Sequence, residues 1–492
     1  MISPVTLTFL KLSASSEPYS HQASKLKRTI LIRPQVLYSS HMHSLAGHLN
    51  LLEKCGCDFF ISAQEVKVDD IISARQMRHI IMPELDELLD DKTPRAPHYP
   101  YEKTFEQARS DPYVIMHTSG STGLPKPIPI NHGWVAAIDA QNLVPDEKTD
   151  GRPLWIFKNS GVDFMKPIRE FAPFPPFHII GNVAMMVRTV FGHTTLIFGP
   201  RDRMTMPQAA LDILQYAGAQ KAFLNPGMLE EFAHIPDALE KLVVLDEIVY
   251  GGGILSQRVG TKISSVTRLT NLWGATEYGV CILLQADRED WPYIAFEPNY
   301  NGIEWRQEAE DLFEMVIVRK PNAIRYQPTF ALYPEADEWP TRDIWSKHPT
   351  KAHHWLYEGR LDDLICYADG NKYHPISEEA RFCSHPLIKS ALMVGDRRKQ
   401  PALILELRDS LDKEEALERI WPSVVEENAV APSVGQIAKT HVLFASTEKP
   451  FVRVAKGTVQ RRLTADLYKD EIDELYAKNG DKAVPLVTRV SS

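Results

Sequence analysis

The stretch HTSGSTGLPK at residues 117–126 gathers hydroxyl side chains, glycines and a lysine immediately after an apolar run. A strand that runs into such a loop is typical of two structures: a solvated turn, or a cradle of backbone N–H groups and hydroxyls around a phosphate. Lys126 favours the phosphate. The loop is not a Walker loop, because counting from Gly120 puts Pro125 at the second glycine and Pro127 at the Ser/Thr position. The spacing therefore predicts a nucleotide-phosphate loop of another kind.

Other stretches carry polar groups that hydrophobic packing alone does not require. His178 lies inside FPPFHIIGN, where a lone histidine is usually a core or surface residue. Glu277 follows a predicted strand in NLWGATEYG, and a carboxylate beside a phosphate loop could hold Mg²⁺, although an exposed glutamate is the default interpretation. The stretches TRDIW, YEGRLDD and VAKGTVQRR add Asp343, Arg360 and Lys456. Each of these residues, taken alone, could equally be solvated surface.

The elements that must position these residues follow an α/β pattern. Amphipathic helices are predicted before short apolar strands, as helix 44–54 with strand 58–62, helix 209–217 with strand 221–224, and helix 239–242 with strand 247–250. The two later strands are each followed by a predicted turn, Asn225-Pro-Gly and Gly251-Gly-Gly253. Ligands of open parallel sheets bind beyond the carboxyl ends of the strands, so glycine loops at those ends are candidate binding elements.

The pattern changes beyond about Trp355. A polar turn at 359–363 precedes a compact predicted module. Its parts are an extended run at 364–367, a turn at 368–372, a helix at 376–383, strands at 391–394 and 402–407, and a helix at 413–420. We expect a separate C-terminal α+β subdomain that is joined to the rest through residues 359–363.

Composition limits the class of protein. The chain has 492 residues, of which 44% are hydrophobic and 24% charged, and this length allows a large core with more than one structural unit. A net charge of −9 argues against nucleic acid as the main partner. The five cysteines lack metal-ligand spacing, and no early segment is long and apolar enough for a membrane span. We therefore expect a cytoplasmic protein, although the Ser-rich, basic stretch 13–33 leaves a weak organellar presequence open.

The order of these motifs closely resembles that of the ANL adenylate-forming superfamily, which contains acyl-CoA synthetases, luciferases and the adenylation domains of nonribosomal peptide synthetases. The resemblance runs from about residue 36 to residue 478. The stretches DIWSKHPTKAHHWLYEGRLDDLI, DGNKYHP and KGTVQRRLTADLYKDEIDELY resemble the adenylation domains of fungal peptide-synthetase-like reductases of secondary metabolism.

The resemblance implies an α/β fold with a large AMP-binding subdomain at 36–358, a hinge at 359–363 and a small mobile α+β subdomain at 364–478. An atypical segment (1–35) and a tail (479–492) flank them. The phosphate loop begins at residue 118, earlier than in the family, so we expect the large subdomain to be truncated at its N-terminus. TRD also has Arg342 where many relatives have glycine.

The implied chemistry is attack of a carboxylate on the α-phosphate of ATP, which gives acyl-AMP and pyrophosphate. By resemblance, Glu277 would bind Mg²⁺, Thr276 would lie beside the α-phosphate and Lys456 would bridge the carboxylate and the α-phosphate. His178 is a further candidate catalytic residue. The phosphates would be cradled by Thr118, Ser119, Gly120, Ser121, Thr122, Gly123 and Lys126. Adenine and acyl group would meet Gly251, Gly252, Gly253, Trp273 and Gly274, and the ribose would meet Asp343 and Arg360.

A second half-reaction would transfer the acyl group to a phosphopantetheine thiol after the small subdomain rotates about Asp362, which brings the loop Asp369-Gly370 toward the pantetheine arm. A carrier protein is preferred as acceptor over CoA on the subgroup resemblance alone. We reject Asp409-Ser-Leu411 as a carrier attachment site because no glycine precedes it. The sequence near the C-terminal end has no G-x-G-x-x-G stretch after a predicted strand, so no nicotinamide cofactor is expected.

The substrate is predicted to be an aryl or alkyl carboxylate. Relatives that activate amino acids place an aspartate in the aromatic motif to pair with the substrate ammonium, and a buried ammonium without such a partner is costly. Here Phe177 is followed by His178 instead. Two alternatives remain open: an acyl-CoA ligase, and a non-catalytic or incomplete adenylation-domain remnant.

Overall fold

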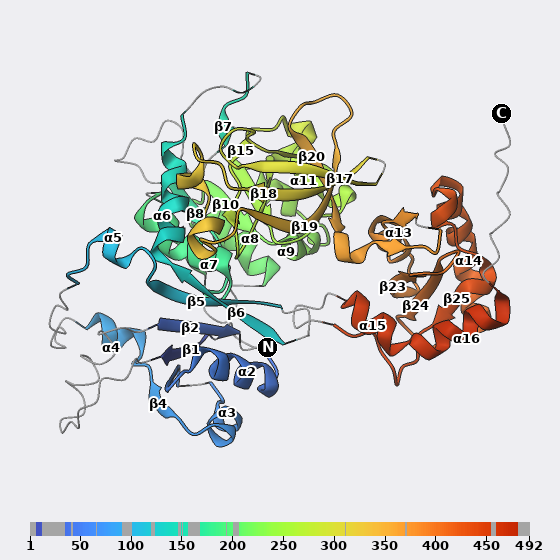
Figure 1. Cartoon of the computed structure of the whole chain (residues 1–492), viewed down its shortest axis with the longest axis horizontal. Helices are drawn as coiled ribbons and strands as arrows, with labels where there is room; N and C mark the ends of the chain where they lie inside the picture. The colour runs from blue at the N-terminus through green and yellow to red at the C-terminus, as the bar shows by residue number, and fades with distance from the viewer. Residues whose placement is uncertain are drawn as a thin grey trace. The chain divides into compact units, whose positions relative to one another are not determined.

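The computed structural model describes the chain with several gaps and divides it into two compact units. The described residues are 6–11, 35–40, 43–64, 66–90, 101–119, 124–145, 149, 151–155, 168–192, 194–199, 206–309, 311–369, 371–453 and 459–480. The first unit comprises Met1–Glu304, Ile317–Trp339 and His348–Leu356, and the second comprises Trp305–Val316, Pro340–Lys347 and Tyr357–Ser492. Figure 1 labels many of the elements of both units.

The first sheet of the first unit has the strand order β4-β3-β1-β2-β5-β6. Its strands are β1 (Thr6–Lys11), β2 (Gln35–Ser40), β3 (Phe59–Ser62), β4 (Arg78–Ile81), β5 (Pro112–Ser119) and β6 (Pro125–Asn131). The sequence suggested no element before residue 36, yet β1 lies inside this sheet and pairs antiparallel with both β2 and β3. Six residues, of which the first four alternate between threonine and an apolar side chain, suffice for a strand once two neighbours supply its hydrogen bonds.

Helix α2 (Leu45–Cys55) confirms the helix predicted at 44–54. Ser44 caps it by accepting from the Gly47 N–H, and Gly56 ends it with φ +58°, a left-handed conformation that glycine adopts without a steric penalty. Leu51 and Leu52 are fully buried. The helix therefore packs its apolar stripe against the first sheet.

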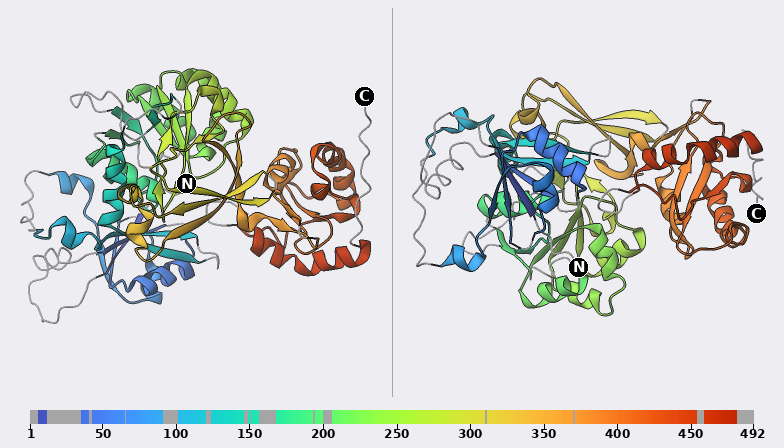
Figure 2. Two further views of the ribbon diagram at one scale, coloured as in Figure 1. Left: turned by 45° about the horizontal axis from the view of Figure 1, so that its top comes forward. Right: turned by 90° about the horizontal axis from the view of Figure 1, so that it is seen from below.

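The second sheet is entirely parallel, with the order β12-β11-β10-β8-β9. Its strands are β8 (Ile168–Phe171), β9 (Thr194–Ile197), β10 (Lys221–Leu224), β11 (Glu247–Gly251) and β12 (Arg268–Leu272). The accompanying helices are α8 (Pro207–Tyr216), α9 (Pro226–Phe232), α10 (Ala238–Leu242) and α11 (Gln257–Val266). In both views of Figure 2 the helices of this green part of the chain lie around its strands. The predicted helix and strand pairs in this region are confirmed.

The predicted turn at Asn225-Pro-Gly is wrong, because these residues begin helix α9. Asn225 caps the helix: its Oδ1 accepts from the Met228 N–H at 2.8 Å. Pro226 follows at the first helical position, where the missing N–H costs nothing. The same residues that break a strand here start a helix, and only the apolar residues Met228, Leu229 and Phe232 downstream distinguish the two outcomes.

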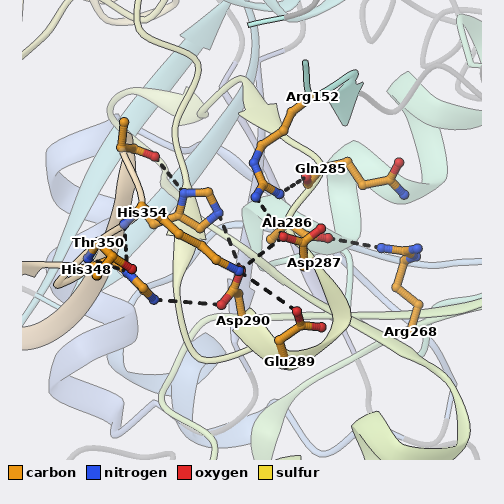
Figure 3. A network of polar contacts seen from close by, with 12 residues as sticks. Arg152, Arg268, Gln285, Ala286, Asp287, Glu289, Asp290, His348, Thr350 and His354 are labelled. Carbon is orange, nitrogen blue, oxygen red and sulfur yellow. Dashed lines mark hydrogen bonds and ion pairs between the residues drawn. The ribbon is translucent and has the colours of Figure 1, made fainter. Parts of the chain in front are cut away.

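A polar network joins the segment after β15 (Leu283–Leu284) to the loop between β19 (Glu338–Lys347) and β20 (His354–Arg360), as Figure 3 shows. Its centre is Asp290, which is buried and forms an ion pair with Lys351. Lys351 also lies 3.1 Å from Asp287, and Arg152 reaches Asp287 at 2.7 Å. These ion pairs tie three stretches of the first unit together.

Four further strands each contain residues of both units: β17 (Ile303–Ala309), β18 (Leu312–Val318), β19 and β20. They belong to a sheet with the order β16-β20-β19-β18-β17. Short elements complete the first unit: α3 (Asp69–Ala74), α4 (Leu85–Leu89), α5 (Phe105–Ala108), α6 (His132–Ala140), β7 (Leu154–Trp155), α7 (Ile179–Asn182), β16 (Ile294–Ala295) and α12 (Thr329–Leu332).

The C-terminal part of the second unit is an α+β module. Its elements are β21 (Ile365–Cys366), β22 (Lys372–Tyr373), α13 (Ile376–Phe382), β23 (Ile388–Val394), β24 (Ala402–Leu407), α14 (Lys413–Val430), β25 (Val442–Phe444), α15 (Arg461–Leu467) and α16 (Lys469–Asn479). Helix α14 extends ten residues beyond the predicted 413–420, past Pro422, because Ala416, Ile420 and Val424 form a continuous buried stripe. No helix in the described parts of either unit is long and apolar enough to cross a membrane.

Candidate functional site

The predicted phosphate loop is flanked by an antiparallel ladder. Strand β5 carries His117 and Thr118 opposite Pro127 and Lys126 of β6, and the ladder extends to Ser119 and Pro125. The ends of the loop are therefore fixed as neighbouring backbone positions. Lys126 is exposed. The predicted phosphate-binding residues Gly120, Ser121, Thr122 and Gly123 lie outside the described residues.

The glycine triplet and the Trp-Gly pair lie side by side at the carboxyl ends of two neighbouring parallel strands. Gly251 ends β11 and pairs with Leu272, the last residue of β12, directly before Trp273. A Cβ on Gly251 would lie 2.8 Å from the Leu272 carbonyl oxygen, and Gly252 has φ +83°. Glycine is needed at Gly251 for the approach of β12 and at Gly252 for its left-handed backbone. By contrast, a Cβ on Gly253 would make an ordinary contact with Pro226 at 3.5 Å.

Thr276 and Glu277 lie in the tight hairpin between β13 (Gly274–Ala275) and β14 (Gly279–Val280). A Cβ on Gly274 would lie 2.3 Å from the Gly279 carbonyl oxygen, so only glycine fits there. Thr276 is buried and Glu277 half-buried. Burial, with a smaller contribution from the charge of Glu277, raises the pKa of Tyr333 to about 12. The hairpin thus holds one carboxylate just beyond the carboxyl edge of the second sheet.

His178 caps helix α7 rather than packing in a core. Its Nδ1 accepts from the Ile180 N–H at 3.2 Å, and the side chain is exposed. In the neutral ring the proton therefore resides on Nε2. The preceding residue, Phe177, stacks on the ring of His117, with centroids 6.3 Å apart and an angle of 16° between the planes.

In the second unit, the predicted ribose-binding residues form an ion pair. Asp343 on β19 is 4% exposed, and its Oδ1 lies 3.0 Å from Nη1 of Arg360, the last residue of β20. The same Nη1 donates to the Thr341 carbonyl oxygen at 2.9 Å. Arg360 therefore holds the Asp343 carboxylate in place.

The predicted hinge residue is held by an unusual neighbour. Asp362 lies 2.7 Å from Nη2 of Arg342 and 4.0 Å from Nη2 of Arg360. Arg342 has φ +66°, a conformation that glycine adopts without strain and that arginine rarely takes. This backbone conformation gives a physical reason for glycine at this position in relatives. Both partners of the Arg342 ion pair are about half exposed, so the pair itself contributes little stability.

A buried cluster anchors Asp363, the last residue of the predicted hinge. Arg461, the first residue of α15, donates from Nη1 to both carboxylate oxygens of Glu379 at 2.6 and 2.8 Å, and from Nη2 to the Met393 carbonyl oxygen at 2.8 Å. Its Nε reaches the Asp363 carbonyl oxygen at 3.4 Å. Burial raises the pKa of Glu379 to about 7 although the Arg461 charge opposes it. Sequence reasoning missed this cluster, and Lys456 lies outside the described residues.

The donor set fits a loosely held magnesium ion. Among the described residues, no group of three or more His, Cys, Asp or Glu side chains is placed to hold a metal. Mg²⁺ keeps several waters and is commonly bound through one or two carboxylates plus substrate phosphates, so a single half-buried glutamate such as Glu277 is sufficient. The described residues therefore fit an ion that is bound together with a nucleotide.

Comparison with known proteins shows that two stretches of the chain match models of the AMP-binding enzymes. Residues 42–296 match the family described as AMP-binding enzyme, and residues 362–480 match the AMP-binding enzyme C-terminal domain. The chain is 35% identical to a carboxylic acid reductase of Neurospora crassa over 461 residues, which are 92% of this chain and 43% of that protein. It is 33% identical to the isocyanide synthase-NRPS hybrid crmA of Aspergillus fumigatus over 452 residues, which are 90% of this chain and 28% of that protein.

Among solved structures, the fold is similar to that of the O-succinylbenzoate coenzyme A synthetase of Bacillus subtilis in complex with ATP and a magnesium ion. The TM-score is 0.58 at 17% identity, covering 86% of this chain and 82% of that one. This likeness supports the fold alone. The chain spans less than half the length of either of these two relatives.

Proposed function

The chain belongs to the AMP-binding enzyme family, the adenylate-forming superfamily, and from this we propose that it activates an aryl or alkyl carboxylic acid with ATP and passes the acyl group to a phosphopantetheine thiol of a carrier protein. The observation that carries the proposal is the placement of Gly251, Gly252 and the Trp273–Glu277 segment together at the carboxyl ends of β11 and β12. Ligands of parallel α/β sheets bind at this edge.

In the first half-reaction the substrate carboxylate attacks the α-phosphorus of ATP and pyrophosphate leaves. We propose that Trp273 stacks on adenine, that Thr276 donates to the α-phosphate, and that Lys126 binds the phosphates together with the loop that precedes it. Asp343, held by Arg360, accepts from the ribose hydroxyls. Lys456 supplies positive charge to the carboxylate and the α-phosphate as charge builds on the phosphoryl oxygens.

Glu277 is the proposed magnesium ligand. When bound, the ion would neutralise phosphate charge and assist pyrophosphate departure. The protein contributes a carboxylate whose position is fixed by the β13–β14 hairpin, because Gly274 packs directly against the backbone of Gly279. The role of the hairpin is therefore to orient one ligand, while the nucleotide and water complete the coordination.

The acid is proposed to lack an α-ammonium group. The position after the aromatic Phe177 is His178, and its Nδ1 already accepts a backbone N–H as the helix cap. A neutral imidazole with its proton on Nε2 presents a donor, which suits a carbonyl or hydroxyl of the acid and not an ammonium. We propose that His178 contacts the acid in this way.

A carrier is proposed as the preferred acceptor on the resemblance to peptide-synthetase-like enzymes, and the similarity to an isocyanide synthase-NRPS hybrid supports this preference. The second candidate is an acyl-CoA ligase, in which the thiol of CoA would accept the acyl group. Direct competition between CoA and a phosphopantetheinylated carrier in a thioester assay distinguishes them. A non-catalytic remnant would instead be folded but would gain no thermal stability from Mg·ATP, because only a ligand bound by the native state stabilises it.

The half-reactions test the proposed mechanism separately. Asp362→Pro fixes φ near −65° and should block rotation, leaving acyl-AMP formation largely intact and abolishing thioester formation. Asp362→Ala is the matched control, because it removes the ion pair with Arg342 without fixing the backbone. Lys456→Ala should do the reverse and spare thiolation of pre-formed acyl-AMP. Equal loss of both reactions in a folded Asp362→Pro protein would contradict the hinge mechanism.

A further inference from the structure

His117 lies near the end of β5, directly before the phosphate loop, and its side chain contacts segments other than the neighbouring strand β6. It occupies β5 directly before Thr118 and opposite Pro127. Its ring meets the end of β2 at Ser40, the start of the α2 region at His43, and Phe177 just before α7. Two stretches that are distant from His117 in the sequence, residues 40–43 and Phe177, therefore meet at one imidazole.

The contacts of the imidazole define its tautomer. The Ser40 backbone N–H donates to Nε2 of His117 at 3.3 Å, so Nε2 must be unprotonated. The proton of the neutral ring then resides on Nδ1, which lies 3.3 Å from Nε2 of His43. The His43 backbone N–H in turn donates to the Ser40 carbonyl oxygen at 3.1 Å. His117 thus donates through one nitrogen and accepts through the other, and this requires the neutral form.

The surroundings keep the ring neutral. Burial, followed by the nearby imidazoles of His43, His178 and His48, lowers the pKa of His117 to about 3. His43 and His48 act on the ring from the α2 side, and His178 acts on it from the start of α7.

From this geometry we propose that His117 is a positioning residue for the two ends of the phosphate loop, Thr118 and Lys126, because it holds the end of β5 against β2, the start of α2 and the aromatic segment at Phe177. The inference rests on the proposed function and extends it. The β5–β6 ladder fixes the two ends of the loop relative to one another, whereas His117 fixes them relative to the segment that is proposed to contact the acid. The loop is needed while ATP still carries its β- and γ-phosphates and is not needed once pyrophosphate has left.

A core histidine without this role would behave differently on substitution. A phenyl ring at position 117 keeps the volume and the stacking on Phe177 but makes neither hydrogen bond. If His117 only fills space, His117→Phe should affect both half-reactions equally, through the fraction of folded protein. If it positions the loop, the loss should appear as a higher KM for ATP in the first half-reaction only.

The test compares His117→Phe and His43→Phe, singly and together, with His132→Phe as the matched control on α6. ATP–pyrophosphate exchange gives KM for ATP and for the acid, and thiolation of pre-formed acyl-AMP gives the second half-reaction. Two lost hydrogen bonds predict that KM for ATP rises about tenfold in His117→Phe. We expect KM for the acid and the thiolation rate to stay within about twofold of wild type. The double variant should be no worse than His117→Phe, because the two rings share one interaction.

Wild-type kinetics for ATP in a folded His117→Phe protein, or an equal loss in both half-reactions, would overturn the positioning role while leaving the proposed function intact. Absence of exchange in the wild-type protein with every acid tested would overturn the proposed function and the inference with it. Far-UV circular dichroism and the thermal midpoint of each variant confirm that the protein is folded.

Discussion

Arg461→Met should destabilise the C-terminal module strongly, because it leaves a buried carboxylate without its main partner. In the wild-type protein the side chains of Arg461 and Glu379 are 15% and 10% exposed, and the guanidinium donates to both carboxylate oxygens. The same guanidinium also holds the carbonyl oxygens of Met393 and Asp363. Methionine can fill most of the volume but supplies no donor.

The expected magnitude follows from burial. Removing one partner of a buried ion pair typically costs about 3–5 kcal/mol, because the remaining charge is uncompensated. Glu379 can escape part of this cost by taking up a proton, and burial already raises its pKa to about 7. A carboxyl group whose pKa is higher in the folded protein than in the unfolded chain lowers the free energy of unfolding as the pH rises from the unfolded pKa to the folded pKa. The substitution raises the folded pKa further, so the deficit at pH 8 should exceed that at pH 6 by up to about 1.4 kcal/mol.

Hydrogen exchange measured by mass spectrometry at the amides of α13, β23 and α15 reports the loss of stability locally. Denaturant unfolding at pH 6 and pH 8 gives the free energy of unfolding of each variant. Arg462→Met is the matched control, because Arg462 is the adjacent residue, carries the same charge and is exposed. Equal stability of the two variants, or a deficit from Arg461→Met that shrinks on going from pH 6 to pH 8, would refute the reasoning.

Two further predictions concern the first unit. Lowering the pH from 7 to 5 should cost about 2 kcal/mol through His117, because its folded pKa of about 3 lies below that of the unfolded chain and stability is lost as the pH falls below about 6.5. Urea unfolding should show a smaller loss over this pH range in His117→Phe, and an identical loss would contradict the assigned burial. Gly260→Ala would place a Cβ 2.1 Å from the Trp291 ring and should cost about 1–3 kcal/mol in calorimetry. Ser265→Ala, exposed on the same helix, should be within about 0.5 kcal/mol of wild type, and equal effects would refute the packing argument.

The α/β alternation could be predicted because each local signal agreed with the tertiary environment. Helix α2 has its serine cap, its apolar stripe and its closing glycine all in the sequence. In the pair α8 and β10, buried residues at helical spacing are followed by a short continuous run of buried residues, which is typical of a strand in a parallel sheet. The glycine triplet was placed correctly at the end of β11 because glycine after an apolar strand is a strong local signal.

The features that were missed depend on partners distant in sequence. Strand β1 is stabilised by ladders to β2 and β3, and nothing in Thr6–Lys11 specifies those partners. Asn225-Pro-Gly has the same local chemistry in a turn and at a helix start. The Arg461–Glu379 pair joins residues 82 positions apart, and the His117–His43 pair joins residues 74 apart, so no local pattern reveals either. The polar character of these residues was visible in the sequence, but their burial was not.

The most direct test of the central claim is ATP–pyrophosphate exchange with Mg²⁺ over a panel of aryl, alkyl and amino acids, in wild-type protein and in Lys456→Ala. We predict exchange that depends on an aryl or alkyl carboxylic acid and is lost in Lys456→Ala. A folded wild-type protein that gives no exchange with any acid, or gives it with amino acids alone, would contradict the account.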